Sequence, residues 1–253
     1  MNDKELKEYL LSEEQKTFQG WDFSYLDGRW IDEELPWDYR ELINKYVKES
    51  DNILDIGTGG GEFILSLKRD PLKTSVTEAY GPNIELCQKT LLPLGYKVYP
   101  LTGDDKLYNI PDDYFDCVID RHESFDVLEV KRVLKNNGLF ITQQVGALNN
   151  DELARFIDSL HLTQFPHMTL PNIKTDLTAR GFKILEGSEY YPYLRFFDIG
   201  AFTYFAKIIN WEFLDFSVEH DFKKLKELKK IIDDKGYIES REHRFYVVAK
   251  NQK

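Results

Sequence analysis

The sequence predicts an α/β fold, in which helices cover both faces of a doubly wound and mainly parallel sheet. Short apolar runs that read as strands alternate with helical patterns, and the first of these runs ends in a glycine-rich turn that enters a helix. A chain of 253 residues, 42% of them hydrophobic, can bury a large core. The expected strands lie, in chain order, at residues 52–56, 74–78, 97–101, 115–119 and 139–145.

Helical patterns lie before and between these strands. A charged helix up to Lys16 and a second helix near residues 37–47 precede the sheet. Pro82 stands where proline starts helices, ahead of a run that contains Ile and Leu. A helix over residues 129–134 is expected to stop at Asn136-Asn137-Gly138, because Gly and Asn commonly end helices.

The pattern changes beyond residue 145. We expect a helix near residues 172–179, a turn at Gly181 and one strand within residues 182–197. Two helical runs and a last strand follow, at residues 199–209, 222–232 and 244–249. No repeat or low-complexity linker is visible. We therefore expect a single domain over residues 1–253, made of an N-terminal cap segment (1–35), a cofactor-binding core (36–150) and a helical insertion (198–235) packed on the sheet.

Composition limits the possible partners. The formal net charge of −11 repels a phosphate backbone, so nucleic acid is a disfavoured partner. The lysine-rich segment 223–230 reads as the solvated face of an amphipathic helix. No run is long enough to span a bilayer, so we expect no membrane partner. Cys87 and Cys117 stand alone in apolar surroundings, which predicts buried thiols, no metal cluster and a cytoplasmic protein.

The most informative stretch is the turn after the first strand. Asp55 precedes glycines at positions 57, 59 and 61, which allow positive φ and let a ligand approach the backbone closely. A dinucleotide-binding turn needs glycine at position 62, but this position is Glu62. A pyrophosphate would meet that carboxylate. The turn therefore suits a cationic ligand better.

The spacing of the acid and the three glycines resembles the first motif of class I S-adenosylmethionine-dependent methyltransferases. Residues 115–118 (FDCV) and 129–138 (E..RVLK..G) resemble the motifs around the fourth and fifth strands of small-molecule methyltransferases. Residues 20–24, 121–123 and 142–146 are similar to a bacterial subfamily of undefined substrate, methyltransferase type 11-like. The resemblance implies a Rossmann-like sheet of seven strands, mostly parallel with an antiparallel last strand, and S-adenosyl-L-methionine as the cofactor.

The glycine turn and several charged residues form the expected cofactor site. Glu78 ends the second strand, where an acid can accept hydrogen bonds from both ribose hydroxyls of an adenosine ligand. Arg121 is expected either at the cofactor's carboxylate or in a salt bridge to Asp120 or Glu123. The resemblance implies that Asp104 or Asp105 binds the adenine amino group. The expected cofactor-binding residues are Asp55, Gly57, Thr58, Gly59, Gly61, Glu78, Asp104, Asp105 and Arg121.

His122 is the expected catalytic residue. The methyl group of S-adenosylmethionine is already activated, so the protein must mainly align the acceptor for in-line attack and exclude water. An acceptor hydroxyl or protonated amine would also need a general base. His122 follows the fourth strand at the crevice where such folds bind ligands, and histidine titrates near neutral pH. Ten aromatic residues are read either as core or as a roof over the acceptor pocket: Trp21, Phe23, Tyr25, Tyr190, Tyr191, Tyr193, Phe196, Phe197, Tyr204 and Trp211.

The predicted function is methyl transfer to a small-molecule acceptor, and neither the acceptor nor the oligomeric state follows from the sequence. Two alternatives stay open. One is a regulatory or assembly protein that keeps the fold and binds the cofactor without turnover. The other is an NAD(P)-dependent oxidoreductase, against which Glu62 argues.

Overall fold

The computed structural model describes residues 1–18, 22–102, 106–107 and 109–253. These residues divide into two compact units. Unit 1 comprises Met1–Leu35, Gly146–Pro166 and Tyr190–Arg244, and unit 2 comprises Pro36–Val145, His167–Glu189 and Phe245–Lys253. The expected cap and insertion thus share a unit with residues 146–166, a grouping that the sequence did not suggest. That the whole chain acts as one domain stays a prediction.

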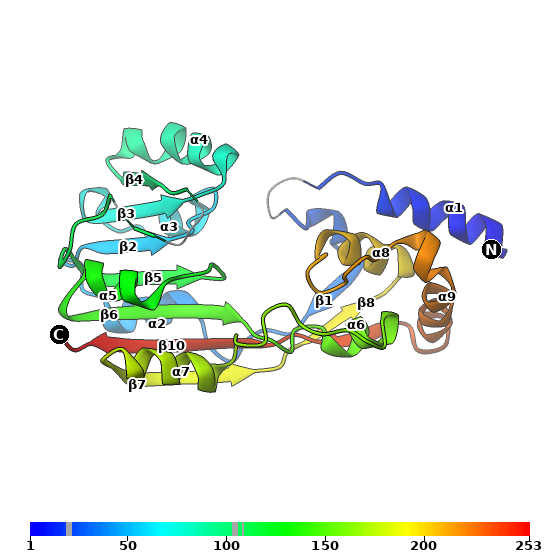
Figure 1. The fold of residues 1–253 in the computed structure, drawn as a ribbon. Helices are drawn as coiled ribbons and strands as arrows, with labels where there is room; N and C mark the ends of the chain where they lie inside the picture. The colour runs from blue at the N-terminus through cyan, green and yellow to red at the C-terminus, as the bar shows by residue number, and fades with distance from the viewer. Residues whose placement is uncertain (19–21, 103–105, 108) are drawn as a thin grey trace. The chain divides into compact units, whose positions relative to one another are not determined.

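Unit 2 is built around a seven-stranded sheet (Figure 1). Its strands follow the order β4 (Lys97–Pro100), β3 (Thr74–Glu78), β2 (Ile53–Ile56), β5 (Phe115–Arg121), β6 (Leu134–Val145), β10 (Arg244–Asn251) and β7 (Phe182–Tyr190). Neighbouring strands from β4 to β6 are parallel, whereas β10 runs in the opposite direction (Figure 1). The predicted sheet of seven strands, mostly parallel with an antiparallel last strand, is confirmed.

The strand bounds agree with the sequence-based ones to within two residues at β2 to β5, and the largest difference is at β6. The sequence predicted a helix as far as Leu134, but α5 (Val127–Val133) ends one residue earlier and β6 begins at Leu134. Leu134 pairs with Phe115, and the register shifts before Cys117 pairs with Leu139. The expected helix stop therefore lies in an irregular part of the strand, where Asn137 has a φ of 64°.

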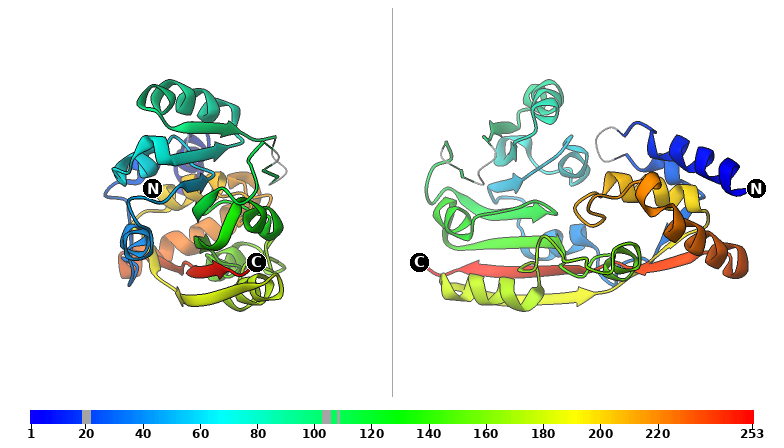
Figure 2. Two further views of the ribbon diagram at one scale, coloured as in Figure 1. Left: turned by 90° about the vertical axis from the view of Figure 1, so that its left-hand side faces the viewer. Right: turned by 45° about the vertical axis from the view of Figure 1, so that its right-hand side comes forward.

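Helices cover both faces of this sheet. On one face, α2 (Tyr39–Tyr46), α3 (Glu62–Ser66) and α4 (Gly81–Thr90) pack against a core that includes Ile53. On the other face, α5 and α7 (Leu170–Ala179) pack against a core that includes Leu54. Figure 2 shows α7 along β7 and β10. Neighbouring residues of β2 thus enter opposite cores, as the alternation of side chains along a strand requires.

Unit 1 has a small sheet of its own, in which neighbouring strands are antiparallel. Its strands are β1 (Trp30–Asp32), β8 (Tyr193–Phe196) and β9 (Ile238–Arg241). The sequence predicted one strand within residues 182–197, but the chain forms β7 and β8 there, in different sheets. Strands β1 and β9 were missed because runs of three or four residues are too short for alternation to stand out.

Four helices complete unit 1 around a core rich in phenylalanine. They are α1 (Asp3–Glu14), α6 (Asp151–Ile157), α8 (Ile199–Ile208) and α9 (Val218–Lys235). Eight residues of α8 are buried, and its Phe202 and Phe205 contact the rings of Phe196, Phe213 and Phe216. Helix α9 buries Leu225, Leu228 and Ile232 between its lysines, as the amphipathic pattern predicted. Of the aromatic residues considered from the sequence, Phe196 and Tyr204 are buried in this core, and Phe23 and Trp211 pack against it. Tyr25, Tyr191 and Phe197 are exposed, and Trp21 lies outside the described residues.

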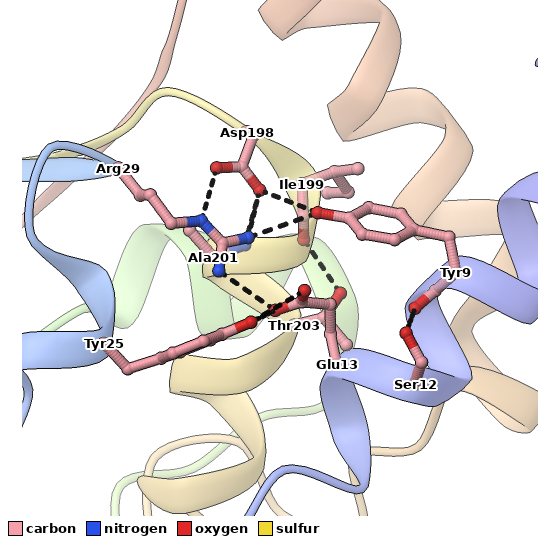
Figure 3. A network of polar contacts seen from close by, with 9 residues as sticks. All are labelled: Tyr9, Ser12, Glu13, Tyr25, Arg29, Asp198, Ile199, Ala201 and Thr203. Atoms are coloured by element: carbon pink, nitrogen blue, oxygen red, sulfur yellow. Dashed lines mark hydrogen bonds and ion pairs between the residues drawn. The ribbon is translucent and has the colours of Figure 1, made fainter.

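A network of ion pairs joins the N-terminal segment of unit 1 to α8 (Figure 3). Arg29 donates to both carboxylate oxygens of Asp198, from Nε at 2.9 Å and from Nη2 at 2.6 Å. It also donates from Nη1 to Glu13 at 3.1 Å, and Tyr25 donates to the same carboxylate at 3.0 Å. Burial, assisted by the charges of Asp198 and Glu13, raises the pKa of Tyr9 to about 12. Because Asp198 is also the N-cap of α8, the network fixes how this helix starts.

Two expectations drawn from the composition concern membrane-spanning helices and the state of the cysteines. No helix in the described part of the chain is both long and apolar enough to cross a membrane. Cys87 and Cys117 are buried free thiols, as predicted. Burial raises the pKa of Cys87 to about 11, which keeps this thiol protonated and unreactive at neutral pH.

Candidate functional site

The glycine turn joins β2 to α3 at the carboxyl end of the sheet. Gly57, Gly59 and Gly61 have φ values of 65°, 63° and 89°, a region that residues with a Cβ avoid. Hydrogen bonds to β3 hold the turn: the Thr58 N–H donates to the Thr77 carbonyl at 3.0 Å, and the Gly57 N–H donates to the Thr77 hydroxyl at 3.1 Å. The turn is therefore shaped both by its own glycines and by the neighbouring strand.

The three glycines differ in what lies beside them. A Cβ at Gly57 would overlap the side chain of Glu123, 2.4 Å from its Cγ, and a Cβ at Gly61 would press on Leu91 at 2.9 Å. A Cβ at Gly59 would meet nothing within 4 Å. Packing therefore explains two of the glycines, and the space beside Gly59 is where a ligand can lie against the backbone.

Glu78 lies directly beside this turn. Its Oε2 accepts the Gly59 N–H at 2.8 Å, and its Oε1 accepts the N–H groups of Ala79 and Tyr80, each at 2.8 Å. The side chain is buried, with 6% of the residue exposed. Nδ2 of Asn83 also lies 3.5 Å from Oε2, at the long limit for a hydrogen bond. A carboxylate oxygen has two lone pairs, so a ligand hydroxyl can take the place of this weak contact. The structure thus brings the expected ribose-binding acid to the glycine turn and adds a role in holding that turn.

Two buried acids, Asp55 and Asp120, lie one residue before the ends of the neighbouring strands β2 and β5. Burial raises the pKa of Asp55 to about 7, against the opposing charge of Arg121. Burial also raises the pKa of Asp120 well above its ordinary value. Its Oδ1 accepts the Thr142 hydroxyl at 3.1 Å and the Gln144 amide, whereas its Oδ2 has no partner among the described residues. A cation placed near either carboxyl would favour its ionised form.

A hollow opens beside Glu78 at the ends of β2 and β3. Its walls are mainly apolar, with acids among them, which suits a planar group that carries a few polar atoms. Asp104 and Asp105, expected to bind an adenine amino group, lie outside the described residues. The lining includes Gly57, Glu78, Leu101, Leu107, Glu123 and Phe125.

Arg121 lies over the ring of Phe63, near the start of α3. Its guanidinium carbon is 4.4 Å from the ring centroid, and the Phe63 ring stacks on Tyr39 with centroids 5.6 Å apart. Within the described residues, no ion pair joins Arg121 to Asp120 or Glu123, the salt bridges considered from the sequence. A cation–π contact holds the guanidinium. Its donors can therefore take up an anionic group.

His122 follows β5 with an unusual backbone conformation. Its φ is 65°, which is uncommon for a residue other than glycine. Its N–H donates to the Gln143 carbonyl at 2.9 Å, and its Nε2 lies 3.2 Å from Nε2 of Gln143. The Gln143 Oε1 in turn accepts the indole N–H of Trp37 at 2.8 Å. Neither Trp37 nor Gln143 was expected at this site from the sequence. A pair of glutamines within a strand of otherwise buried residues could have pointed to Gln143.

No protein-family model matches the chain, and no curated protein matches its sequence. Solved structures do match it. A proposed methyltransferase of Bacillus halodurans C-125 superposes with a TM-score of 0.57 and 17% identity, covering 85% of this chain and 99% of its own. The YcgJ protein of Bacillus subtilis superposes with a TM-score of 0.55 and 17% identity, covering 85% of this chain and 98% of its own. An S-adenosylmethionine-dependent methyltransferase of Mesorhizobium loti superposes with a TM-score of 0.51 and 13% identity, covering 83% of this chain and 96% of its own.

Because the sequence identities are only 13–17%, the similarity to these structures concerns the fold alone. It agrees with the strand order of unit 2, in which β10 lies between β6 and β7, and with the position of the glycine turn after β2. The chain therefore has the fold of class I S-adenosylmethionine-dependent methyltransferases.

Proposed function

We propose that this chain transfers a methyl group from S-adenosylmethionine to a small-molecule acceptor. The observation that carries the proposal is the contact between Glu78 and the N–H of Gly59, at 2.8 Å. It joins a buried carboxylate, which can accept ribose hydroxyls, to a glycine with open space beside it. The two residues meet because β2 and β3 are parallel neighbours whose carboxyl ends lie at one edge of the sheet.

The charge around the turn supports a cationic cofactor over a dinucleotide. The side chains of Glu62, Glu78 and Glu123 all lie against the turn, and Asp55 lies just before it. A sulfonium would be attracted to these carboxylates and would favour the ionised form of Asp55. A pyrophosphate would be repelled by them, which argues against the NAD(P)-dependent alternative.

The proposal gives each expected residue a part in binding. The backbone from Gly57 to Gly61, with Thr58, passes beneath the methionine and ribose, and Glu78 accepts the ribose hydroxyls. Arg121 pairs with the cofactor's carboxylate. The hollow beside Glu78 takes the adenine, and the role of Asp104 or Asp105 at the adenine amino group stays a prediction.

Besides binding the cofactor, the chain must position the acceptor. The sulfonium supplies an activated methyl group when the cofactor is bound, so the protein must hold the acceptor in line and keep water away. We assign the contact with the acceptor to His122, because it follows β5 at the edge where the turn lies. The net charge of −11 supports a small acceptor over nucleic acid and, with the solitary buried thiols, a cytoplasmic location.

Calorimetric titration tests the proposal. S-adenosylmethionine and S-adenosylhomocysteine should bind and NAD should not. Binding to the folded chain alone should raise stability by about 2.7 kcal/mol at a hundredfold excess over Kd. Heat with NAD and none with the two sulfur compounds would reverse the choice of cofactor.

Turnover needs a separate measurement, because a regulatory or assembly protein with this fold would also bind the cofactor. Pools of small-molecule acceptors incubated with S-adenosylmethionine should release S-adenosylhomocysteine in at least one pool. Cofactor binding without release from any pool would favour the regulatory alternative.

A further inference from the structure

Three side chains of unit 2 form a chain of hydrogen bonds that ends on His122. The indole Nε1 of Trp37 lies 2.8 Å from Oε1 of Gln143, and Nε2 of Gln143 lies 3.2 Å from Nε2 of His122. Trp37 is half-buried and packs edge-on against Tyr246, with ring centroids 5.0 Å apart. Gln143 is 6% exposed and pairs with Arg121 across β5 and β6. Ring packing therefore holds Trp37 in place, and burial and strand pairing hold Gln143.

The chemistry of these groups fixes the direction of each bond. An indole N–H can only donate, so the atom of Gln143 that faces Trp37 must be the carbonyl oxygen. The amide nitrogen of Gln143 then faces His122 and can only donate. The Nε2 of His122 must accept, which places the proton of the neutral ring on Nδ1.

This arrangement limits what the imidazole can do. Its Nε2 lone pair accepts from Gln143, and its Nδ1 carries a proton, so neither nitrogen has a lone pair left for a proton from an acceptor. A proton arriving on Nε2 would face the amide N–H of Gln143. Turning that amide over would relieve the clash, but it would bring a second N–H against the indole of Trp37.

We propose that Trp37 and Gln143 are positioning residues that hold His122 as a neutral Nδ1–H ring, so that it does not act as the general base. The inference rests on the proposed function for its catalytic meaning, and it changes the role expected for His122 from the sequence. Without His122 as a base, an acceptor that loses its proton unaided fits this site best. Carboxylic acids and thiols do so near neutral pH, whereas aliphatic alcohols do not. The acceptor class is thus a carboxylate or a thiolate.

The proton position is measured directly by ¹⁵N NMR of histidine-labelled protein, with the His122 signals assigned by their loss in His122→Asn. Asn tolerates the left-handed backbone of this position. In the wild type at neutral pH, the Nδ1–H form should exceed the Nε2–H form at least tenfold. Gln143→Glu replaces the donor by an acceptor and should move the proton to Nε2. An Nε2–H ring in the wild type would overturn the inference.

Trp37→Phe is the second variant, because a buried carboxylate at position 143 can prevent folding. It removes the indole donor, keeps an aromatic ring beside Tyr246 and lets the amide turn over, so both ring forms should appear. An unchanged preference for Nδ1–H in Trp37→Phe would show that the indole does not set the proton position, and would also overturn the inference. Lys4→Met, on the exposed face of α1, is the control and should leave the spectrum unchanged.

The acceptor pools separate this inference from the proposed function. One pool holds carboxylic acids and thiols, and the other holds aliphatic alcohols. Release of S-adenosylhomocysteine from the first pool alone supports the inference, and release from the alcohols overturns it. If neither pool reacts, the acceptor class inferred here is wrong, and the proposed function is judged by the wider acceptor pools described above. The NMR result still decides whether Trp37 and Gln143 fix the ring.

Discussion

Replacing Glu78 should affect both the glycine turn and the cofactor, and the two effects can be separated. In the structure, its carboxylate accepts the backbone N–H groups of Gly59, Ala79 and Tyr80, and its Oε2 also lies 3.5 Å from Nδ2 of Asn83. Glu78→Ala removes the three backbone bonds and this long contact. Glu78→Gln keeps one acceptor oxygen, which can serve Ala79 and Tyr80, and places an amide N–H opposite the N–H of Gly59.

The magnitude follows from which of these N–H groups water can reach. A hydrogen bond to a charged group contributes about 1.5–3 kcal/mol, and a buried donor left unpaired costs about 1–3 kcal/mol. Ala79 and Tyr80 are exposed, so water can replace the carboxylate there, whereas Gly59 is half-buried. We therefore expect Glu78→Ala to lose about 2–3 kcal/mol of unfolding free energy and Glu78→Gln about 1–2 kcal/mol.

Urea unfolding measures the stability, and calorimetric titration with S-adenosylhomocysteine measures the affinity of the folded variants. Both substitutions should weaken binding by about 1.5–3 kcal/mol, because the ribose hydroxyls lose their charged acceptor. Glu85→Gln is the matched control. Glu85 lies on the exposed side of α4 in an i,i+4 pair with Lys89 at 3.8 Å, so its loss should change stability by less than about 0.5 kcal/mol.

Two outcomes would refute parts of this reasoning. A lower unfolding free energy with unchanged affinity would leave Glu78 as a support of the turn and remove it from the ribose. An unchanged urea midpoint in Glu78→Ala would show that the three hydrogen bonds contribute nothing measurable to the fold.

Three further predictions concern other parts of the chain. Gly59→Ala should lower the affinity for S-adenosylhomocysteine at least tenfold, because the methyl group fills the space beside the backbone. Gly28→Ala is the control, since Gly28 has a similar φ of 72° and also has open space beside it. It measures the loss of about 1–2 kcal/mol of unfolding free energy that the backbone conformation alone imposes on alanine. Because burial raises the pKa of Asp55 to about 7, the folded chain keeps a proton that the unfolded chain loses above about pH 4, and wild-type stability falls as pH rises through that window. Asp55→Asn should therefore gain stability relative to the wild type between pH 4 and 8, by up to about 4 kcal/mol, and a constant difference across this range in urea unfolding would contradict the assignment. Arg29→Met should cost about 2–4 kcal/mol, since it leaves the buried Glu13 without its cation, and a loss below about 0.5 kcal/mol would make the network of Figure 3 energetically unimportant.

Much of the fold was predictable because its signals are local. The bounds of β3 and the start of α4 follow from runs of about ten residues, in which apolar spacing and a single proline decide the structure. The glycine turn is equally local, since its three positive φ values need glycine whatever surrounds them. The contact of Glu78 with this turn was also accessible, because two parallel strands must end at the same edge.

Other features were not accessible because they depend on residues far apart in the chain. Unit 1 gathers three separate segments, and its Arg29–Asp198 pair joins residues 169 positions apart. Strands β1 and β9 have no pattern of their own and form only by pairing with β8. Sequence periodicity identifies a buried face of an element, but it does not say which other element will cover that face.

The sequence by itself determined the sheet of unit 2, the glycine turn and the acid beside it, because each is specified by backbone conformation or by strand order. Only the tertiary structure decided what His122 can do. Its proton position depends on Gln143, 21 residues away, and on Trp37, which lies 106 residues before Gln143. No local pattern links the three, because a donor and an acceptor become partners only when the sheet and the segment before α2 have brought them within 3.2 Å.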